Sequence, residues 1–413
     1  MSATDDLQCF LVGGAVRDRL LGEPVVERDW VVVGATPDQM LDRGFKQVGN
    51  DFPVFLHPDT GEEYALARTE RKTGSGHQAF EFNTDPSVTL EDDLTRRDLT
   101  INAIAERPDG TLVDPCGGHQ DLENRVLRHI GEPFTEDPLR VLRVARFAAR
   151  LAHLGFTIAE PTLALMQEIA ASGELETLSP ERVWSELSRA LMSKRPSVFV
   201  ETLRQCGALK VILPEVDALF GVPQPEKWHP EIDTGLHILL ALDYAASQGY
   251  SGPVRYAVLM HDLGKALTPE ELLPAHHGHE KSSAELVERV GARLRTPKRW
   301  QSLAVSVARY HLHSHTAKAL KSKTLLKMFK AIGAMREPDT LTHFLEACIA
   351  DARGRTGLDR REYPQAEYLQ GALQAVLSVD NSAIAATGVT GAAFGEALHK
   401  ARLRALDAFR DTV

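Results

Sequence analysis

The sequence predicts an α+β protein with a strand-rich head over residues 1–135 and an almost entirely helical remainder. In the head, short β-type runs such as FLVGG, DWVVVG, PVFLH and EYALAR are separated by Gly, Pro and Asp. After about residue 135 the apolar residues recur at helical spacing to the last residue. A chain of 413 residues suggests two to four domains.

Composition excludes several classes of protein. No apolar run approaches the roughly 20 residues that span a bilayer, and MSATDDLQ lacks the pattern of a signal peptide. The four cysteines are far apart and form no CxxC, which suits a reducing cytoplasm. The net charge of -10 argues against a large non-specific nucleic-acid surface, although a local basic groove remains compatible with it. We therefore expect a cytoplasmic protein without a membrane segment.

The first strand, FLVGG, ends at Gly13-Gly14, and AVRDRLLG then reads as a helix. Backbone N–H groups at such a junction can approach phosphates closely because glycine has no Cβ. Arg17, one turn into the helix, would add a charge-assisted contact. A plain tight turn is the alternative.

Glu27 and Asp29 open the next strand. Residues i and i+2 of a strand point to the same face, so both carboxylates would lie side by side near the Gly-Gly turn. Two adjacent like charges are unfavourable unless a cation joins them, and Mg²⁺ prefers one or two carboxylates plus phosphate oxygens. A strand edge with protective charges is the alternative.

Two further segments of the head have clear local signals. TPDQMLDRG predicts a helix with Thr36 as N-cap, Pro37 in the first turn and Gly44 as its stop. RKTGSGHQAFEF predicts a mobile loop. In EDDLTRRDLTINAIA (91–105), Arg97 could bind a triphosphate with Asp98 near metal ions; a helix N-terminus with solvated charges is the alternative.

DPLRVLRVARFAARLAHLG predicts the helix that follows the head, with Asp137 as its N-cap. Its arginines are spaced three, three and four apart and form one stripe: Arg140, Arg143, Arg146 and Arg150. Four arginines without interleaved acids repel one another, which favours a polyanionic partner over a solvated face. Pro-rich GVPQPEKWHPEID (221–233) favours a linker.

Histidines gather between residues 229 and 315. His237 lies 24 residues before His261-Asp262; His276, His277 and His279 follow, then RYHLHSH with His311, His313 and His315, and CIADARGR supplies Asp351. Imidazoles and carboxylates suit Ni²⁺, Co²⁺, Mn²⁺ or Zn²⁺, and a metal-bound water could attack a phosphoester. A His-Asp pair at the end of a surface helix is the alternative.

LVGGAVRD, ERDWVVVG, RRDLTINA and EDPLRVLRVARF, in this order and spacing, resemble the class II tRNA nucleotidyltransferases, the CCA-adding enzymes. FPVFLHPDTGEEYALARTERKTGSG and KWHPEIDTGLH resemble the bacterial long form, which carries an HD phosphohydrolase domain. The resemblance implies a polymerase-β-like nucleotidyltransferase head (1–135), a helical neck and body (136–232), an HD domain (233–355) and a helical tail (356–413).

The resemblance also implies roles for residues. Glu27 and Asp29 would hold Mg²⁺, although the family usually has Asp where Glu27 stands. Nucleotide contacts would come from Gly14, Arg17, Arg97, Arg143 and Arg146, and Asp137 with Arg140 would read the base. In the H…HD…D pattern the metal ligands would be His237, His261, Asp262 and Asp351, with His279 and His311 as auxiliaries. The loop at 72–80 resembles the flexible loop linked to the switch from C to A.

The expected function is template-independent addition and repair of the tRNA 3′-terminal CCA from CTP and ATP. The HD domain would add 2′,3′-cyclic phosphodiesterase, 2′-nucleotidase and phosphatase activity with Ni²⁺ or another transition metal. Leu312 stands where related long forms often have Asp, which bears on the metal count. The alternatives are a poly(A) polymerase, a metal-dependent phosphohydrolase with a nucleotide-sensing head, or a non-catalytic RNA-binding module. The sequence leaves monomer or homodimer open.

Overall fold

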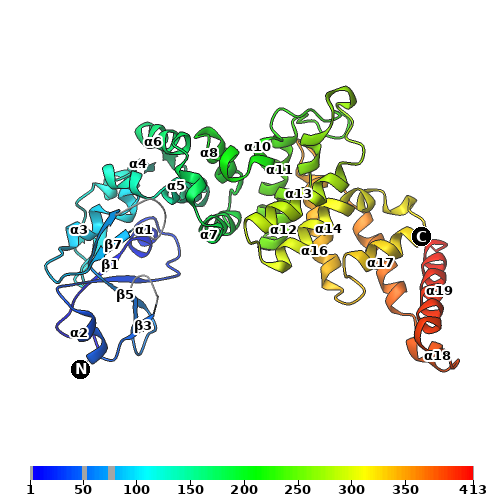
Figure 1. Ribbon diagram of the computed structural model, residues 1–413, viewed down its shortest axis with the longest axis horizontal. Coiled ribbons are helices and arrows are strands. Elements are labelled where there is room, and N and C mark those ends of the chain that lie inside the picture. The colour runs from blue at the N-terminus through cyan, green and yellow to red at the C-terminus, as the bar shows by residue number, and fades with distance from the viewer. Residues whose placement is uncertain (1–2, 49–53, 73–79, 413) are drawn as a thin grey trace. The chain divides into compact units, whose positions relative to one another are not determined.

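The computed structural model describes residues 3–48, 54–72 and 80–412 (Figure 1). The chain forms two compact units. The first comprises residues 1–186 and 201–212, and the second comprises 187–200 and 213–413. The predicted α+β class is confirmed, because the sheet lies in the first unit and the second is helical. The predicted division into four parts stays a prediction.

A mixed sheet organises the first unit. Its strand order is β3-β4-β5-β2-β1-β8-β9. The strands are β1 (Gln8–Val12), β2 (Asp29–Val33), β3 (Lys46–Val48), β4 (Val54–Leu56), β5 (Glu63–Leu66), β8 (Ala105–Glu106) and β9 (Leu112–Val113). Alternating side chains of β1 and β2 feed two cores: Phe10 and Val31 pack in one, Cys9 and Val32 in the other.

Two smaller strand pairs complete the β-structure described in this unit. β6 (Thr69–Lys72) pairs antiparallel with β7 (Phe80–Asn83), and β10 (Val126–Leu127) pairs parallel with β11 (Thr157–Ile158). The loop expected at 72–80 falls almost wholly on residues 73–79, which lie outside the described residues.

Three helices of the first unit lie on segments with predicted helix signals: α1 (Gly14–Leu20), α2 (Pro37–Asp42) and α5 (Leu139–Leu151). The unit also includes α3 (Leu90–Thr95), α4 (Gly118–Asn124), α6 (Glu160–Ala171) and α9 (Leu209–Ile212), while α7 (Pro180–Leu191) and α8 (Ser197–Gln205) run across the division. Helix α2 begins with the predicted cap: Thr36 accepts a hydrogen bond from the Gln39 backbone, and the Gln39 side chain accepts one from Thr36. Gly44, with φ +87°, follows its end.

The second unit is a helical assembly around α12 (Gly252–Met260), which is buried almost throughout and packs against α11, α14 and α16 (Figure 1). Its other helices are α10 (Pro214–Asp217), α11 (Thr234–Ser247), α13 (His279–Arg293), α14 (Lys298–His315), α15 (Ser322–Ala331), α16 (Asp339–Arg353), α17 (Gln365–Leu377), α18 (Asn381–Ala385) and α19 (Gly391–Arg410). Among the described residues, no helix has both the length and the apolar character to cross a bilayer.

The linker expected at 221–233 is wrong. This segment folds back on itself within the second unit: the Gln224 backbone N–H donates to the Ile232 carbonyl at 2.7 Å, and Thr234 Oγ1 donates to the Val222 carbonyl at 2.9 Å. Gln224 and His229 are buried. Proline content suggested a spacer, but the buried polar side chains make the segment part of the core.

Candidate active sites

The turn between β1 and α1 places glycine beside a carboxylate. Val12, the last residue of β1, pairs with Asp29, the first residue of β2. Gly13 follows at φ +65°, and α1 begins at Gly14, one residue before the predicted helix AVRDRLLG. Glu27 precedes β2. The expectation that Glu27 and Asp29 share one strand is therefore wrong. The alternation of side chains along a strand cannot be used to argue that the two carboxylates point to the same face.

The two acids nevertheless interact. Partial loss of solvent and then the negative charge of Glu27 raise the pKa of Asp29, while the Arg97 guanidinium opposes that change. Neither carboxylate has an ion pair or hydrogen bond to another residue within 3–48, 54–72 or 80–412. Adjacent acids that form no ion pair with a described residue fit the donor set that Mg²⁺ prefers.

Arg97 is fixed against the glycine turn. A Cβ placed on Gly13 would lie 2.9 Å from Arg97 Nη1. Arg97 Nη2 donates to Asp93 Oδ2 at 3.0 Å, and Nη1 donates to the Asn102 carbonyl at 3.3 Å. Although burial opposes it, pairing with Arg97 and Arg96 keeps the pKa of Asp93 below its usual value. The sequence was interpreted with Asp93 as one of several solvated acids. Its i, i+4 spacing to Arg97 was the signal that could have predicted this ion pair.

Arg17 lies in the interior, with 1% of its surface exposed. Its guanidinium donates to Asp18 Oδ1 at 2.9 Å and to Asn102 Oδ1 at 2.5 Å, and it lies over the Phe147 ring. Arg17 thus ties α1 to the segment after Arg97. Its direct contact with a nucleotide, like that of Gly14, stays a prediction.

Each arginine of the α5 stripe has a partner from elsewhere in the first unit. Arg140 donates to the carbonyls of Arg96 and Arg97 at 2.7 and 3.1 Å. The other three contact carboxylates: Arg143 contacts Asp98 at 2.7 Å, Arg146 contacts Glu186 at 2.5 Å and Arg150 contacts Asp18 at 2.6 Å. The argument from unrelieved repulsion is therefore wrong, because the fold supplies acids that the helix itself lacks.

Asp137 lies directly before Pro138, which takes the N-cap position of α5 that was predicted for Asp137. The Asp137 side chain still bonds to the first residue of the helix. Its Oδ1 accepts a hydrogen bond from the Leu139 backbone at 3.1 Å. Its Oδ2 accepts one from Arg182 Nη2 at 2.7 Å. Reading of a base by Asp137 and Arg140 stays a prediction, and it would require Asp137 to exchange Arg182 for the base.

The predicted metal ligands of the second unit meet in one buried cluster. His237 lies on α11, His261 and Asp262 directly follow α12, and Asp351 lies on α16. His237 Nε2 lies 3.1 Å and His261 Nε2 3.9 Å from Asp351 Oδ1, and His261 Nε2 lies 3.2 Å from Asp262 Oδ2. Four residues spread over 115 positions of sequence thus present nitrogen and oxygen donors to one point.

The two auxiliary histidines also reach this cluster. His279 Nε2 and His311 Nε2 lie 3.2 and 3.6 Å from Asp262 Oδ1. His276 instead contacts Thr268 and the Pro223 carbonyl. His261 Nε2, Asp262 Oδ1 and His279 Nε2 are buried and lie close to one another, but none of them forms an aligned hydrogen bond with a described residue. These orphaned donor atoms fit a transition metal ion.

Sequence reasoning missed the charged partners of the carboxylates. Lys265 Nζ lies 2.7 Å from Asp262 Oδ2, and Arg355 Nη2 lies 2.7 Å from Asp351 Oδ1. His315 Nε2 lies 2.6 Å from Asp351 Oδ2. Although burial opposes it, His261 and Lys265 hold the pKa of Asp262 well below its usual value. The i, i+3 spacing of Asp262 and Lys265 and the i, i+4 spacing of Asp351 and Arg355 were the local signals.

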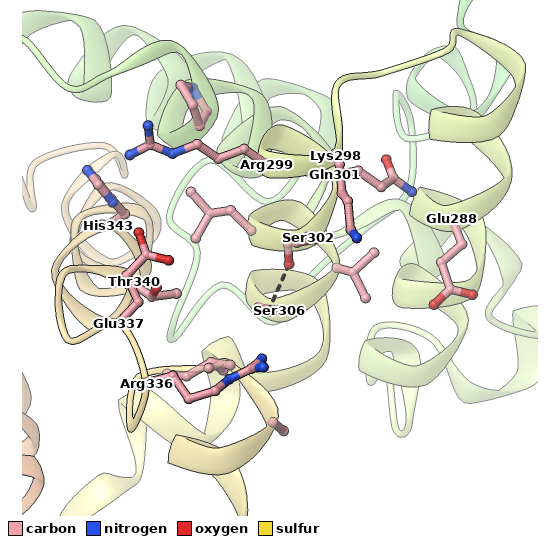
Figure 2. A pocket seen from close by; sticks show the side chains of 16 residues that line it. Glu288, Lys298, Arg299, Gln301, Ser302, Ser306, Arg336, Glu337, Thr340 and His343 are labelled. Atoms are coloured by element: carbon pink, nitrogen blue, oxygen red, sulfur yellow. Dashed lines mark hydrogen bonds between the residues drawn. The ribbon is translucent and has the colours of Figure 1, made fainter. Parts of the chain in front are cut away.

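The second unit also contains a pocket that is lined by none of these cluster residues. It has a volume of about 1190 Å³, and Figure 2 shows Lys298, Arg299, Arg336, Glu337 and Glu288 around it. None of the predicted ligands lines it. Because its charges are mixed and it lacks a metal-binding donor set, we assign the chemistry to the histidine cluster.

Comparison with known proteins decides the family. Three family models match: the poly A polymerase head domain over residues 9–128, the probable RNA and SrmB-binding site of polymerase A over 155–220, and the HD domain over 235–352. The multifunctional CCA protein of Teredinibacter turnerae is 56% identical over 398 residues, covering 96% of this chain and 97% of its own. That of Pseudomonas aeruginosa PAO1 is 55% identical over 405 residues, covering 98% and 99%. The chain belongs to the multifunctional CCA protein family.

Solved structures share the fold of this family member. The apo form II of a CCA-adding enzyme aligns with a TM-score of 0.65 at 22% identity, covering 98% of this chain and 89% of the other. The Thermotoga maritima CCA-adding enzyme complexed with tRNA aligns with a TM-score of 0.61 at 21% identity, covering 98% and 89%. The resemblance to CCA-adding enzymes and the fold of a polymerase head, helical region and HD domain are confirmed.

The family models enclose part of each candidate site. The head model spans Glu27, Asp29 and Arg97, and the HD model spans His237 through Asp351. The stretch from Asp137 to Arg146 falls between the first two models. Residues 221–233, which carry buried polar groups, precede the HD model of this multifunctional CCA family member.

Proposed function

We propose that the chain adds and repairs the 3′-terminal CCA of tRNA from CTP and ATP without a nucleic-acid template. Membership of the multifunctional CCA protein family supports this proposal. The observation that carries it is the pair of uncommitted carboxylates, Glu27 and Asp29, beside the Gly13 turn and the anchored Arg97. This is the arrangement that metal-assisted nucleotidyl transfer requires.

Glu27 and Asp29 would hold Mg²⁺, which would activate the tRNA 3′-hydroxyl for in-line attack on the α-phosphate and stabilise the departing pyrophosphate. Arg97 binds the triphosphate in this proposal. Asp93 and the Asn102 carbonyl hold its guanidinium, so little conformational entropy is lost when a phosphate binds. Gly13 leaves the space in which the guanidinium lies.

Asp137 and Arg140 select the base in this proposal. Cytosine and adenine each present an exocyclic amine donor next to a ring-nitrogen acceptor, which a carboxylate and a guanidinium complement. Uracil and guanine present an oxygen where the carboxylate needs a donor. Rejection is strong because a buried polar group would be left unpaired.

The HD cluster provides the second proposed activity, metal-dependent hydrolysis of 2′,3′-cyclic phosphates, 2′-nucleotides and other phosphomonoesters. The orphaned atoms of His261, Asp262 and His279 carry this part of the proposal. They would hold Ni²⁺ or another transition metal ion, whose bound water would supply the nucleophile. Lys265 and Arg355 hold the carboxylates that face it.

The test is incorporation of single nucleotides into tRNA that lacks CCA, read to nucleotide resolution. We expect CTP alone to add two C residues, and ATP to add one A afterwards. A poly(A) polymerase would instead extend with ATP alone. Asp29→Ala should abolish incorporation and retain hydrolysis of a 2′,3′-cyclic phosphate; incorporation by Asp29→Ala would refute the assignment. Asp137→Ala and Arg140→Ala should relax base choice.

A further inference from the structure

We propose that Glu231 is a positioning residue that fixes the ring of His237 for metal binding. This inference rests on the proposed phosphohydrolase function of the HD cluster. Glu231 lies before α11, in the segment 221–233 and outside the match to the HD domain model.

His237 lies between two carboxylates. Its Nε2 hydrogen-bonds with Asp351 Oδ1 at 3.1 Å, and its Nδ1 lies 2.9 Å from Glu231 Oε1 without forming an aligned hydrogen bond among the described residues. The His237 side chain is fully buried and the Glu231 side chain is 3% exposed. A neutral imidazole has a single ring proton, and a carboxylate can only accept it. When a cation binds Nε2 beside Asp351, the ring proton must stay on Nδ1, and Glu231 Oε1, 2.9 Å away, is placed to accept it once the ring turns into line.

His229 and the local backbone hold Glu231 in place. His229 Nδ1 lies 3.2 Å from the same oxygen, and its ring crosses that of His237 at 81° with centroids 4.6 Å apart. Ile232, the next residue, has φ +60°, and its N–H donates to the His229 carbonyl at 2.8 Å. A β-branched residue in this conformation is unusual and persists where surrounding contacts hold it.

A second metal ion between His229, Glu231 and His237 is the competing arrangement, since their donor atoms lie within 4.8 Å of one another. It would require His237 to bind two cations through its two nitrogens. A histidine that already binds one cation would then have to lose its one remaining ring proton to bind the second. The contact with Glu231 is therefore assigned to orientation, as in metal sites where a carboxylate fixes a histidine ligand.

The test measures binding of Co²⁺ to the metal-free full-length chain, by calorimetry for stoichiometry and by visible absorption for ligand geometry. Glu231→Ala should weaken binding about 10- to 100-fold. Glu231→Gln keeps an acceptor oxygen of the same reach and should recover part of that loss. Glu215→Gln is the matched control, because it disrupts an ion pair with Arg293 in the same unit and touches no predicted ligand.

Each outcome decides the matter. One Co²⁺ per chain, bound more weakly by Glu231→Ala than by Glu231→Gln and normally by Glu215→Gln, supports positioning. Equal affinity in both Glu231 variants and the unaltered chain overturns it. Two ions per chain, one of them lost in Glu231→Ala, also overturns it and makes Glu231 a ligand. Absence of Co²⁺ binding by the unaltered chain refutes the phosphohydrolase site itself, and the inference with it.

Discussion

Replacement of Gly13 by alanine tests whether Arg97 binds the triphosphate. Gly13 has φ +65° and ψ -122°, which only glycine adopts without strain. The added methyl group would lie 2.9 Å from Arg97 Nη1, so the guanidinium must move. The substitution therefore perturbs backbone and arginine together.

The two effects have different magnitudes and different readouts. The backbone strain should cost about 1–3 kcal/mol. At about 2–4 °C per kcal/mol for a unit of this size, the melting temperature falls by several degrees. Loss of a hydrogen bond to a charged group costs about 1.5–3 kcal/mol, which corresponds to about a 10- to 150-fold loss in kcat/KM for the nucleotide.

A matched control separates these effects. Gly61 has φ +70°, and a Cβ placed there meets no atom within 4 Å. Gly61→Ala should therefore lower the melting temperature without impairing nucleotide incorporation. The assay is steady-state incorporation of CTP into tRNA lacking CCA, combined with thermal unfolding. If Gly13→Ala and Gly61→Ala have kcat/KM values within threefold of each other, the role of Arg97 is refuted.

Three further predictions concern the first unit. Asp29→Asn should lower incorporation by at least about 100-fold with unfolding unchanged, because a metal ligand contributes several kcal/mol to the transition state; near-normal rates would contradict the metal role. Although burial opposes it, Arg143 holds the pKa of Asp98 below its usual value. The ionised Asp98 therefore stabilises the fold above pH ~4, and this stabilisation is lost as the pH falls below that. The free energy of urea unfolding should fall less steeply with acid in Asp98→Asn than in the unaltered chain, and an equal fall would contradict the assignment. Glu186→Gln should lower the free energy of unfolding by about 3–5 kcal/mol, because it leaves Arg146 buried without its counter-charge. Replacing both Glu186 and Arg146 by apolar residues should recover most of this loss. A loss below about 1 kcal/mol for Glu186→Gln, measured by urea unfolding, would refute the prediction.

Local signals were sufficient to predict the parts of the fold that depend on neighbouring residues. The turn at Gly13, the Thr36 cap of α2 and the start of α5 after Asp137 all follow from interactions within four residues. The buried HD cluster was also predictable, because histidines and aspartates in this order and spacing are typical of a metal site. Its geometry came from the packing of α11, α12 and α16, which no local pattern encodes.

The long-range ion pairs were not predictable from one sequence. Arg143 and Asp98 are 45 positions apart, and Arg150 and Asp18 are 132 apart. A helix read by itself shows only its own charges, so the stripe looked unbalanced. The segment 221–233 was misread for a related reason. Its prolines suggested a spacer, whereas the Glu231 side chain is buried beside His229 and beside His237 of α11.

The partners of the α5 arginines change what base selection must involve. A free guanidinium stripe would attract any polyanion with little discrimination, because phosphate contacts carry no base information. Here Asp98 and Glu186 neutralise Arg143 and Arg146, and two backbone carbonyls fix Arg140. An arginine held in this way loses little entropy on binding and presents its remaining N–H groups in a defined direction. In this proposal Asp137 must release Arg182 before it can contact a base, whereas Asp137 and Arg140 alone distinguish one base from another. Arg182→Met should therefore change the KM for nucleotide in single-nucleotide incorporation without changing the preference for C and A over U and G, and a changed preference would contradict this assignment.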